Sequence, residues 1–216
     1  ALVKLGTPVI ANVFGHAVED YVEVVRVLED AEGVAAYELN VSCPNTKCGG
    51  IYFSSDPELL RGLVEAVRPA ARRPVIVKLS PNVARIEPLA LAAEAAGADA
   101  ISAVNTFVSL AVDARTRRSR IGAGFGGLSG PAIKPIALRM VYEIARAVKI
   151  PVVGLGGIAS GEDAAEFLIA GASAVEVGTA SFWDPRATVR IARELDKFLA
   201  GEGVGNVREI VGTLEM

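Results

Sequence analysis

The sequence predicts an α/β protein with a parallel sheet, in the arrangement of a (β/α)8 TIM barrel of which six strands are evident. Short apolar runs alternate with amphipathic stretches along the whole chain. Every apolar run ends in polar residues or glycines. A barrel collects its functional residues from the ends of many strands, whereas an open doubly wound sheet uses one crevice, so the pattern favours the barrel.

Six runs are predicted to be buried parallel strands because they are apolar almost without interruption. They are "PVIANVFG" (8–15), "AAYELNVS" (35–42), "PVIVKLS" (74–80), "DAISAVNT" (99–106), "PVVGLGG" (151–157) and "SAVEVGT" (173–179). Apolar positions at helical spacing, with charges on the opposite face, predict helices over 18–31, 57–71, 84–96, 135–148, 161–170 and 186–199.

A closed barrel needs eight strands, so two βα units are expected to be missing from the front of this sequence. The six runs would then be strands 3 to 8. Residues 1–216 are accordingly expected to form one domain, the C-terminal three quarters of a barrel. Two connections are long, one after the second run and one after the fourth, and loops of this length are usually functional lids or small added hairpins.

The composition excludes several classes of protein. With 51% hydrophobic and 22% charged residues the chain is expected to build a large core. A net charge of -3 and a single short basic patch, "RTRRSR" (115–120), argue against nucleic-acid binding. Charged residues or glycines interrupt each apolar run before it reaches the length of a membrane span. The two cysteines make no disulfide framework, which favours a reducing, cytoplasmic location.

Cys43 stands in "LNVSCPNTKCGG" (39–50), directly after a predicted strand. A thiol at this rim can act as a nucleophile or as an acid/base, although most free cysteines are small buried hydrophobes. His16 is the only histidine, so a Cys-His protease and a zinc site are both disfavoured. General base chemistry, or no role, remains. Cys48 lacks the position at a strand end and is interpreted as incidental.

Lys78 interrupts an otherwise apolar strand, where a lone ammonium is costly unless it meets an anion or hydrogen-bond acceptors. It is a surface edge residue, a side chain that snorkels to solvent, a Schiff-base amine, or a cation placed against a bound anionic ring. Asn40, Asn105 and Thr106 also lie at strand ends. Their amide and hydroxyl groups suit a flat polar ligand at one rim, although an asparagine there can simply form a turn.

Glycines dominate the segment 152–180, in which one strand ends at Gly156 and Gly157 and the next at Gly178 and Thr179. Such glycines let backbone N–H groups approach an anion, and a following helix N-terminus adds aligned dipoles. The loops after the last two strands of a barrel commonly bind phosphate, so we expect a phosphate site here. The alternative is that the glycines only make tight turns.

These motifs together resemble the class 1 dihydroorotate dehydrogenases, closest to the class 1B catalytic subunit. The resemblance rests on "NVSCPN", "VKLSPN", "VNT", "GGLSGPAIKP", "GLGGI" and "GASAVEVGTA", which follow in order along essentially the whole chain. It implies an FMN-containing (β/α)8 barrel that oxidises dihydroorotate to orotate in pyrimidine synthesis. The family's residues in the first two βα units, including a substrate-binding lysine, have no counterpart here.

The resemblance also implies roles for individual residues. Cys43 would be the base that removes the C5 proton of dihydroorotate while hydride leaves C6 for the flavin. Lys78 would lie against the pyrimidine end of the flavin, and Asn40 would contact both flavin and substrate. Substrate would further be bound by Asn105 and Thr106. The remaining FMN contacts would be Asn12, Val104, Gly130, Gly156, Gly157, Gly178 and Thr179.

The family resemblance extends to partners. It implies a homodimer and a second subunit that carries FAD and an iron–sulfur cluster, since this chain has no cysteine set for such a cluster. Three alternatives stay open: a related flavin barrel acting on another dihydropyrimidine, an incomplete barrel without catalysis, and an aldolase that uses Lys78.

Overall fold

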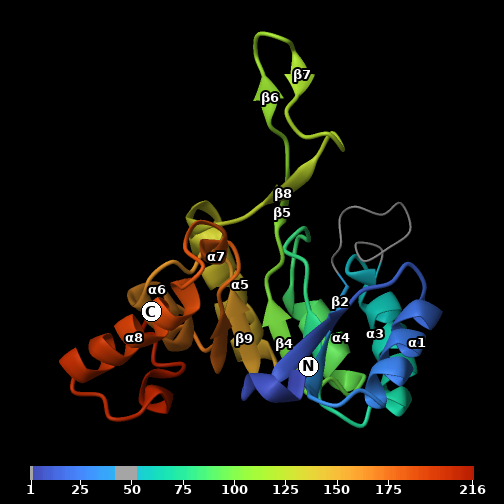
Figure 1. Cartoon of the computed structure of the whole chain (residues 1–216), viewed down its shortest axis with the longest axis horizontal. Coiled ribbons are helices and arrows are strands. Elements are labelled where there is room, and N and C mark those ends of the chain that lie inside the picture. The colour runs from blue at the N-terminus through green and yellow to red at the C-terminus, as the bar shows by residue number, and fades with distance from the viewer. Residues whose placement is uncertain (1, 42–52) are drawn as a thin grey trace.

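The computed structural model describes residues 2–41 and 53–216, and its central feature is one six-stranded parallel sheet (Figure 1). The sheet is built from β1 Val9–Val13, β2 Val34–Asn40, β3 Val75–Lys78, β4 Ala100–Ala103, β9 Val152–Leu155 and β10 Ala174–Glu176. The helices are α1 Val18–Glu29, α3 Pro57–Val67, α4 Glu87–Ala95, α5 Lys134–Ala147, α6 Gly161–Ile169, α7 Ala180–Trp183 and α8 Ala187–Gly201. The six predicted strands and six predicted helices are confirmed.

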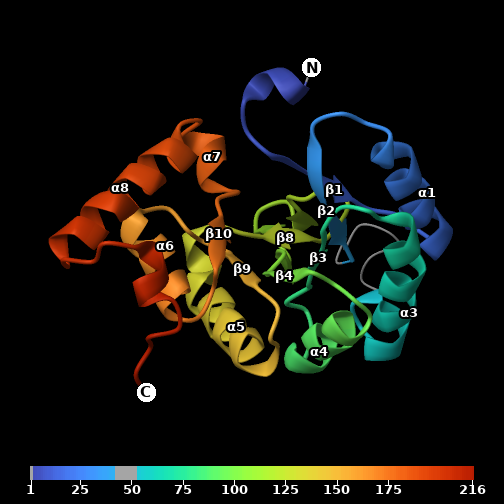
Figure 2. The ribbon, with the colours of Figure 1, turned by 90° about the horizontal axis from the view of Figure 1, so that it is seen from below.

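The strands lie in the order in which they occur along the chain, β1-β2-β3-β4-β9-β10, and every neighbouring pair is parallel. The helices line the outer side of a curved sheet, and the arc is open between α8 and α1 (Figure 2). A doubly wound sheet would reverse its strand order at a switch point. Consecutive order with helices on the outer side is therefore the arrangement of part of a (β/α)8 barrel.

The core lies between the sheet and the helices. Its largest fully buried side chains come from both layers, among them Tyr21, Tyr37, Leu60, Ile101 and Phe167. Local signals set the helix starts: Asp56 caps α3 by accepting from the N–H groups of Glu58 and Leu59, with Pro57 in the first turn. Gly97 and Gly171 follow α4 and α6 with positive φ, which ends these helices before the next strand.

The long connection after β4 contains added hairpins, which is one of the two predicted possibilities for this loop. Strands β5 Phe107–Ser109 and β8 Gly126–Leu128 pair antiparallel, and β6 Val112–Asp113 pairs with β7 Arg118–Ser119. Together they form an arm that rises from the carboxyl ends of the strands (Figure 1). Short 3-10 helices lie at Leu2–Leu5, Arg68–Ala70, Pro131–Ile133 and Val207–Ile210. None of the helices within the described ranges is long and apolar enough to span a membrane.

Candidate active site

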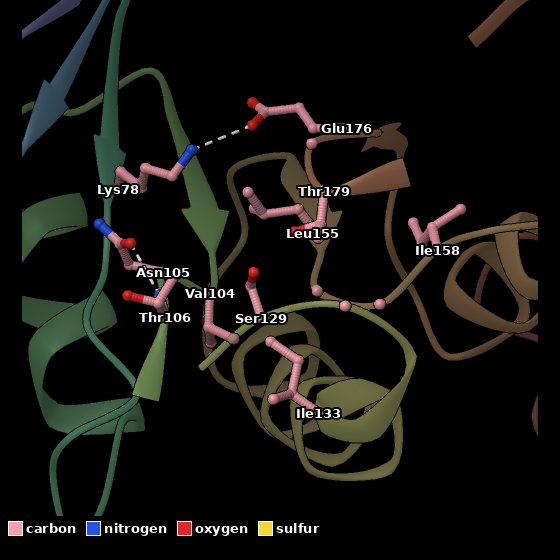
Figure 3. Close-up of a pocket in the computed structure, with 14 residues that line it drawn as sticks. Lys78, Val104, Asn105, Thr106, Ser129, Ile133, Leu155, Ile158, Glu176 and Thr179 are labelled. Carbon is pink, nitrogen blue, oxygen red and sulfur yellow. Dashed lines mark hydrogen bonds and ion pairs between the residues drawn. The ribbon is translucent and has the colours of Figure 1, made fainter. Parts of the chain in front are cut away.

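A pocket of about 550 Å³, open to solvent, lies at the carboxyl ends of β3, β4, β9 and β10 (Figure 3). The lining includes many of the residues singled out from the sequence. These are Lys78, Val104, Asn105, Thr106, Gly130, Gly156, Gly157, Gly178 and Thr179. The remaining lining residues are Ser129, Ile133, Leu155, Ile158 and Glu176.

Asn12 and Asn40 join the pocket through a chain of side-chain amides. Asn105 Nδ2 donates to Asn40 Oδ1 at 3.2 Å, and Asn40 Nδ2 donates to Asn12 Oδ1 at 3.4 Å. Asn12 in turn donates to the carboxylate of Glu38. The parallel register explains this order, because Asn12 pairs with Glu38 and Asn40 pairs with Lys78 across neighbouring strands. Three strand ends therefore present amides along one rim.

Lys78 is held between two carboxylates. Its Nζ lies 3.3 Å from Glu38 Oε2 and 3.2 Å from Glu176 Oε2. The Lys78 side chain is only 14% exposed, and β3 lies between β2 and β4, so the interpretation of Lys78 as an edge residue is wrong. In Figure 3 its ammonium points across the pocket towards Glu176. Lys78 is thus a largely buried cation with anionic partners, which satisfies the physical requirement for a charge in a strand.

The pKa values of the two carboxylates are shifted in opposite directions. Burial raises the pKa of Glu38, but Lys78 and the hydrogen bonds from Ser102 and Asn12 outweigh it and hold that pKa below its usual value. For Glu176, burial and the nearby charge of Glu38 raise the pKa above its usual value, and Lys78 only partly offsets them. Glu176 is therefore the carboxylate of this pair that binds a proton more readily.

Glu38 and Glu176 were missed by the sequence analysis. Each is a carboxylate inside an apolar strand, in "AYELN" and "AVEV", which is the same signal that singled out Lys78. Ser102 and Ser129 were also missed. A serine within a strand or beside a glycine carries no comparable signal, because it is common in both places.

The glycine loops leave backbone donors available. Within residues 2–41 and 53–216, the N–H groups of Gly157, Gly178 and Thr179 donate no hydrogen bond. Gly130, Gly156 and Gly157 have φ of 87°, 128° and 92°, which glycine adopts without strain. A Cβ added at Gly178 would meet nothing within 4 Å. The loop after β10 therefore offers open space at Gly178, and the loops after β9 and β10 both present N–H groups, which suits an anion such as phosphate.

The N-terminus of α6, in contrast, contributes little to an anion site. Ser160 Oγ accepts from the N–H of Asp163 at 3.1 Å, and Glu194 Oε2 accepts from the N–H of Gly161 at 2.9 Å. Asp163 also accepts from the N–H groups of Ala159 and Ser160. Because side-chain oxygens already occupy these donors, the N–H groups at the start of α6 are not available to a phosphate. The glycines themselves supply the donors.

The donor set suits a flat amphipathic ligand with a phosphate at one end. Ile133, Leu155 and Ile158 offer apolar surface on one side, while Lys78 and the amide and hydroxyl groups of Asn105 and Thr106 lie on the other, with Val104 beside them (Figure 3). FMN has these features, since its isoalloxazine ring is planar and polar at one edge and its chain ends in phosphate. The residues present therefore fit FMN. Cys43 and Cys48 lie outside the described residues.

Comparison with known proteins points to one family. Residues 3–199 match the family described as dihydroorotate dehydrogenase. A protein of Solibacter usitatus named "Putative dihydroorotate dehydrogenase A (fumarate)" is 72% identical over 215 residues, covering 100% of this chain and 71% of the relative. The Geobacter sulfurreducens dihydroorotate dehydrogenase B (NAD(+)) catalytic subunit is 53% identical over 212 residues, covering 98% and 70%. The corresponding subunit of Thermodesulfovibrio yellowstonii is 49% identical over 214 residues, covering 99% and 71%.

Proposed function

Because the chain belongs to the dihydroorotate dehydrogenase family, we propose that it catalyses the FMN-dependent oxidation of dihydroorotate to orotate in de novo pyrimidine biosynthesis. The observation that carries this proposal is the pocket, which combines a largely buried lysine, a row of amides and glycine loops at one rim of the sheet. The fold and the family match support it over nearly the whole chain.

FMN would be held at both ends of the pocket. Its phosphate and ribityl chain would lie against Gly130, Gly156, Gly157, Gly178 and Thr179, whose loops supply N–H donors, with open space at Gly178. Its ring would lie on the apolar surface, with Val104 and Asn12 among its contacts. When bound, FMN supplies the acceptor for a hydride. Lys78 would stabilise negative charge at the pyrimidine edge because an ammonium in a low-dielectric site acts strongly at short range.

Dihydroorotate would be recognised by the amide row. Asn40, Asn105 and Thr106 can pair donors with acceptors on the ring, and the hydrogen bond between Asn105 and Asn40 fixes their relative orientation. Cys43 would take the C5 proton at its Sγ. The sequence supports this role through the position of Cys43 three residues after the end of β2, where Asn40 already lies at the pocket rim.

We also propose that the six strands are strands 3 to 8 of the barrel, and that two further βα units complete it. The sheet ends at β1 and β10, which each have one partner among the described strands. Apolar side chains are exposed near both edges, with Ile10 at 50%, Phe14 at 55%, Phe182 at 89% and Trp183 at 54%. Such surface is normally covered in a folded protein, which supports further strands at this opening.

An anaerobic visible absorption spectrum of the full-length protein, before and after dihydroorotate is added, tests the proposal. We expect flavin bands that bleach on addition of dihydroorotate. Flavin bands that bleach with dihydrouracil instead would assign the protein to another dihydropyrimidine. A colourless protein that also fails to bind added FMN would favour an incomplete barrel without catalysis, and trapping of Lys78 by borohydride with a sugar phosphate would favour an aldolase.

The electron acceptor is a separate part of the proposal. The names of the Geobacter relative and the Thermodesulfovibrio relative describe catalytic subunits of an NAD(+) enzyme, whereas the name of the Solibacter relative gives fumarate. We propose that this protein is of the NAD(+) type, and that it forms a homodimer and works with a separate subunit that carries FAD and an iron–sulfur cluster. The arm exposes Val108, Leu110, Val112, Phe125 and Leu128, which supports contact with another chain. Reoxidation of the reduced protein by fumarate alone, without a copurifying subunit, would assign it to the fumarate type.

A further inference from the structure

One ammonium is shared by two carboxylates at the inner surface of the sheet. Lys78 on β3 contacts Glu38 on β2 at 3.3 Å and Glu176 on β10 at 3.2 Å. The side chains of Lys78 and Glu38 are 14% and 6% exposed, so these charges are largely removed from water. With both carboxylates ionised the group would carry one net negative charge, and that charge would face the pocket in which Glu176 is a lining residue.

The surroundings make Glu38 the permanent anion of the pair. Ser102 Oγ donates to Glu38 Oε1 at 2.6 Å, and the amide of Asn12 donates to Oε2. Among the described residues, Glu176 receives a hydrogen bond only from Lys78. Despite burial, Lys78 and these hydrogen bonds hold the pKa of Glu38 below its usual value, whereas burial and the charge of Glu38 raise the pKa of Glu176. If one of the two must be neutralised, it is Glu176.

We propose that Glu176 is a proton-accepting residue that takes up one proton from solvent when negative charge appears on a ligand beside Lys78. This inference rests on the proposed function, in which that charge arises at the pyrimidine edge of reduced FMN. Lys78 then pairs with the new anion and with Glu38, and Glu176 becomes neutral. The net charge of the ammonium, the two carboxyl groups and the ligand's new charge taken together is then one negative charge, the same as that of the three side chains before. The Glu176 side chain is 34% exposed, which gives solvent access for the proton.

The groups that face Glu176 leave few competitors for this proton. Lys78 from β3 and Glu38 from β2 are the charged side chains that act on Glu176 within the described part of the chain. Asn12 from β1 and Ser102 from β4 contact Glu38 and do not ionise in the ordinary pH range. Leu155 from β9 and Thr179 after β10 complete the nearby lining without a charge.

The stoichiometry follows from charge balance. Two-electron reduction of FMN to its anionic reduced form takes up two electrons and one proton. With Glu176 as an additional acceptor the protein takes up two protons for two electrons, in the pH range between the pKa of Glu176 beside oxidised FMN and its higher pKa beside reduced FMN. Outside that range one proton accompanies two electrons, provided that the flavin is anionic when reduced.

The pH dependence of the midpoint potential, measured by chemical reduction of the FMN-loaded full-length protein, tests this inference. In the unmodified protein we expect a slope that rises to about 59 mV per pH unit, and in Glu176→Gln about 30 mV, because each proton per two electrons corresponds to ~30 mV. Glu166→Gln is the matched control, since Glu166 pairs with Lys134 at 2.8 Å outside the pocket, and it should behave as the unmodified protein.

A second measurement does not depend on the variant. The reduced-minus-oxidised infrared spectrum of the unmodified protein should gain a carbonyl band of a protonated carboxylic acid. A slope of about 30 mV throughout, an unchanged slope in Glu176→Gln, or no such band would overturn the inference while leaving the proposed function intact. Failure of dihydroorotate to reduce the flavin would overturn the proposed substrate alone, and failure to bind FMN would overturn both.

Discussion

Asn105 Nδ2 donates a hydrogen bond of 3.2 Å to Oδ1 of Asn40, so amides at the ends of β4 and β2 meet across the end of β3. The two side chains meet because β2 and β4 end at the same edge of the sheet. The side-chain oxygen of the same residue, Asn105 Oδ1, accepts a hydrogen bond from the N–H of Thr106 at 2.7 Å. The rim is therefore organised before any ligand binds.

Replacing Asn105 with alanine should weaken orotate binding about ten- to a hundredfold, because one hydrogen bond to a ring substituent is lost and Asn40 loses its partner. FMN content should remain unchanged. Titration of the flavin spectrum with orotate measures the effect. Asn206→Ala is the matched control, since Asn206 caps the last 3-10 turn by accepting from Arg208 N at 2.9 Å. Equal affinity for orotate in Asn105→Ala would contradict substrate recognition by this rim.

Replacing Cys43 with alanine in the full-length protein should slow dihydroorotate oxidation about a hundred- to ten-thousandfold, which is the usual contribution of a general base. Stopped-flow bleaching of the flavin measures this step directly. Cys48→Ala removes the other thiol of the same segment and should leave the rate unchanged. If both variants reduce the flavin at the rate of the unmodified protein, Cys43 is not the base.

Gly178→Ala should reduce FMN affinity without loss of stability. A Cβ there meets no protein atom within 4 Å, so the change in the free energy of unfolding should stay within about 0.5 kcal/mol while the methyl group fills the proposed phosphate space. Gly62→Ala in the exposed part of α3 is the matched control and should add about 1 kcal/mol of stability. Fluorescence titration with FMN and chemical unfolding measure the two quantities.

Gly157→Ala, by contrast, should lower both the FMN affinity and the stability of the protein. Its Cβ would lie 2.8 Å from Gly130 O and 2.9 Å from Lys134 Cβ, at a φ of 92°. The strained backbone should cost about 1 to 3 kcal/mol of stability. Normal stability in Gly157→Ala, or normal FMN binding in Gly178→Ala, would contradict the geometry assigned to these loops.

Glu29 should stabilise the fold in a pH-dependent manner. Burial raises its pKa, but hydrogen bonds from Arg72 and Arg73 outweigh it, so the pKa falls from 4.5 to about 2. The folded pKa lies below the unfolded one, so this stabilisation is complete above about pH 4.5 and is lost as the pH falls towards 2. At neutral pH, Glu29→Gln should cost about 2 to 4 kcal/mol because charged partners are left unpaired.

Urea unfolding of Glu29→Gln and the unmodified protein at several pH values measures the difference, which should shrink in acid. Glu23→Gln, on the exposed face of the same helix, is the control and should change stability by no more than about 0.5 kcal/mol at any pH. A difference between Glu29→Gln and the unmodified protein that is independent of pH would show that Glu29 does not act through its ionisation.

The pattern of the sequence was sufficient to locate the strands, since a buried parallel strand is apolar on both faces and ends where polar residues begin. The strand predicted over 74–80 is observed as Val75–Lys78, and the strand predicted over 173–179 as Ala174–Glu176. Lys78 was recognised as unusual for the same reason. Its partners Glu38 and Glu176 were not, because the contacts between side chains on β2, β3 and β10 depend on how the sheet curves and not on any local pattern.

The sequence by itself determined the βα order, the glycine loops and the presence of an ionisable side chain inside a strand, because these depend on periodicity and on the conformational range of single residues. Only the tertiary structure decided that Lys78 is shared by Glu38 and Glu176, that the start of α6 is occupied by Asp163 and Glu194, and that Asn12, Asn40 and Asn105 form one row. These contacts join residues up to 98 positions apart. Charge interactions act through space, so the sheet that brings strand ends together determines them.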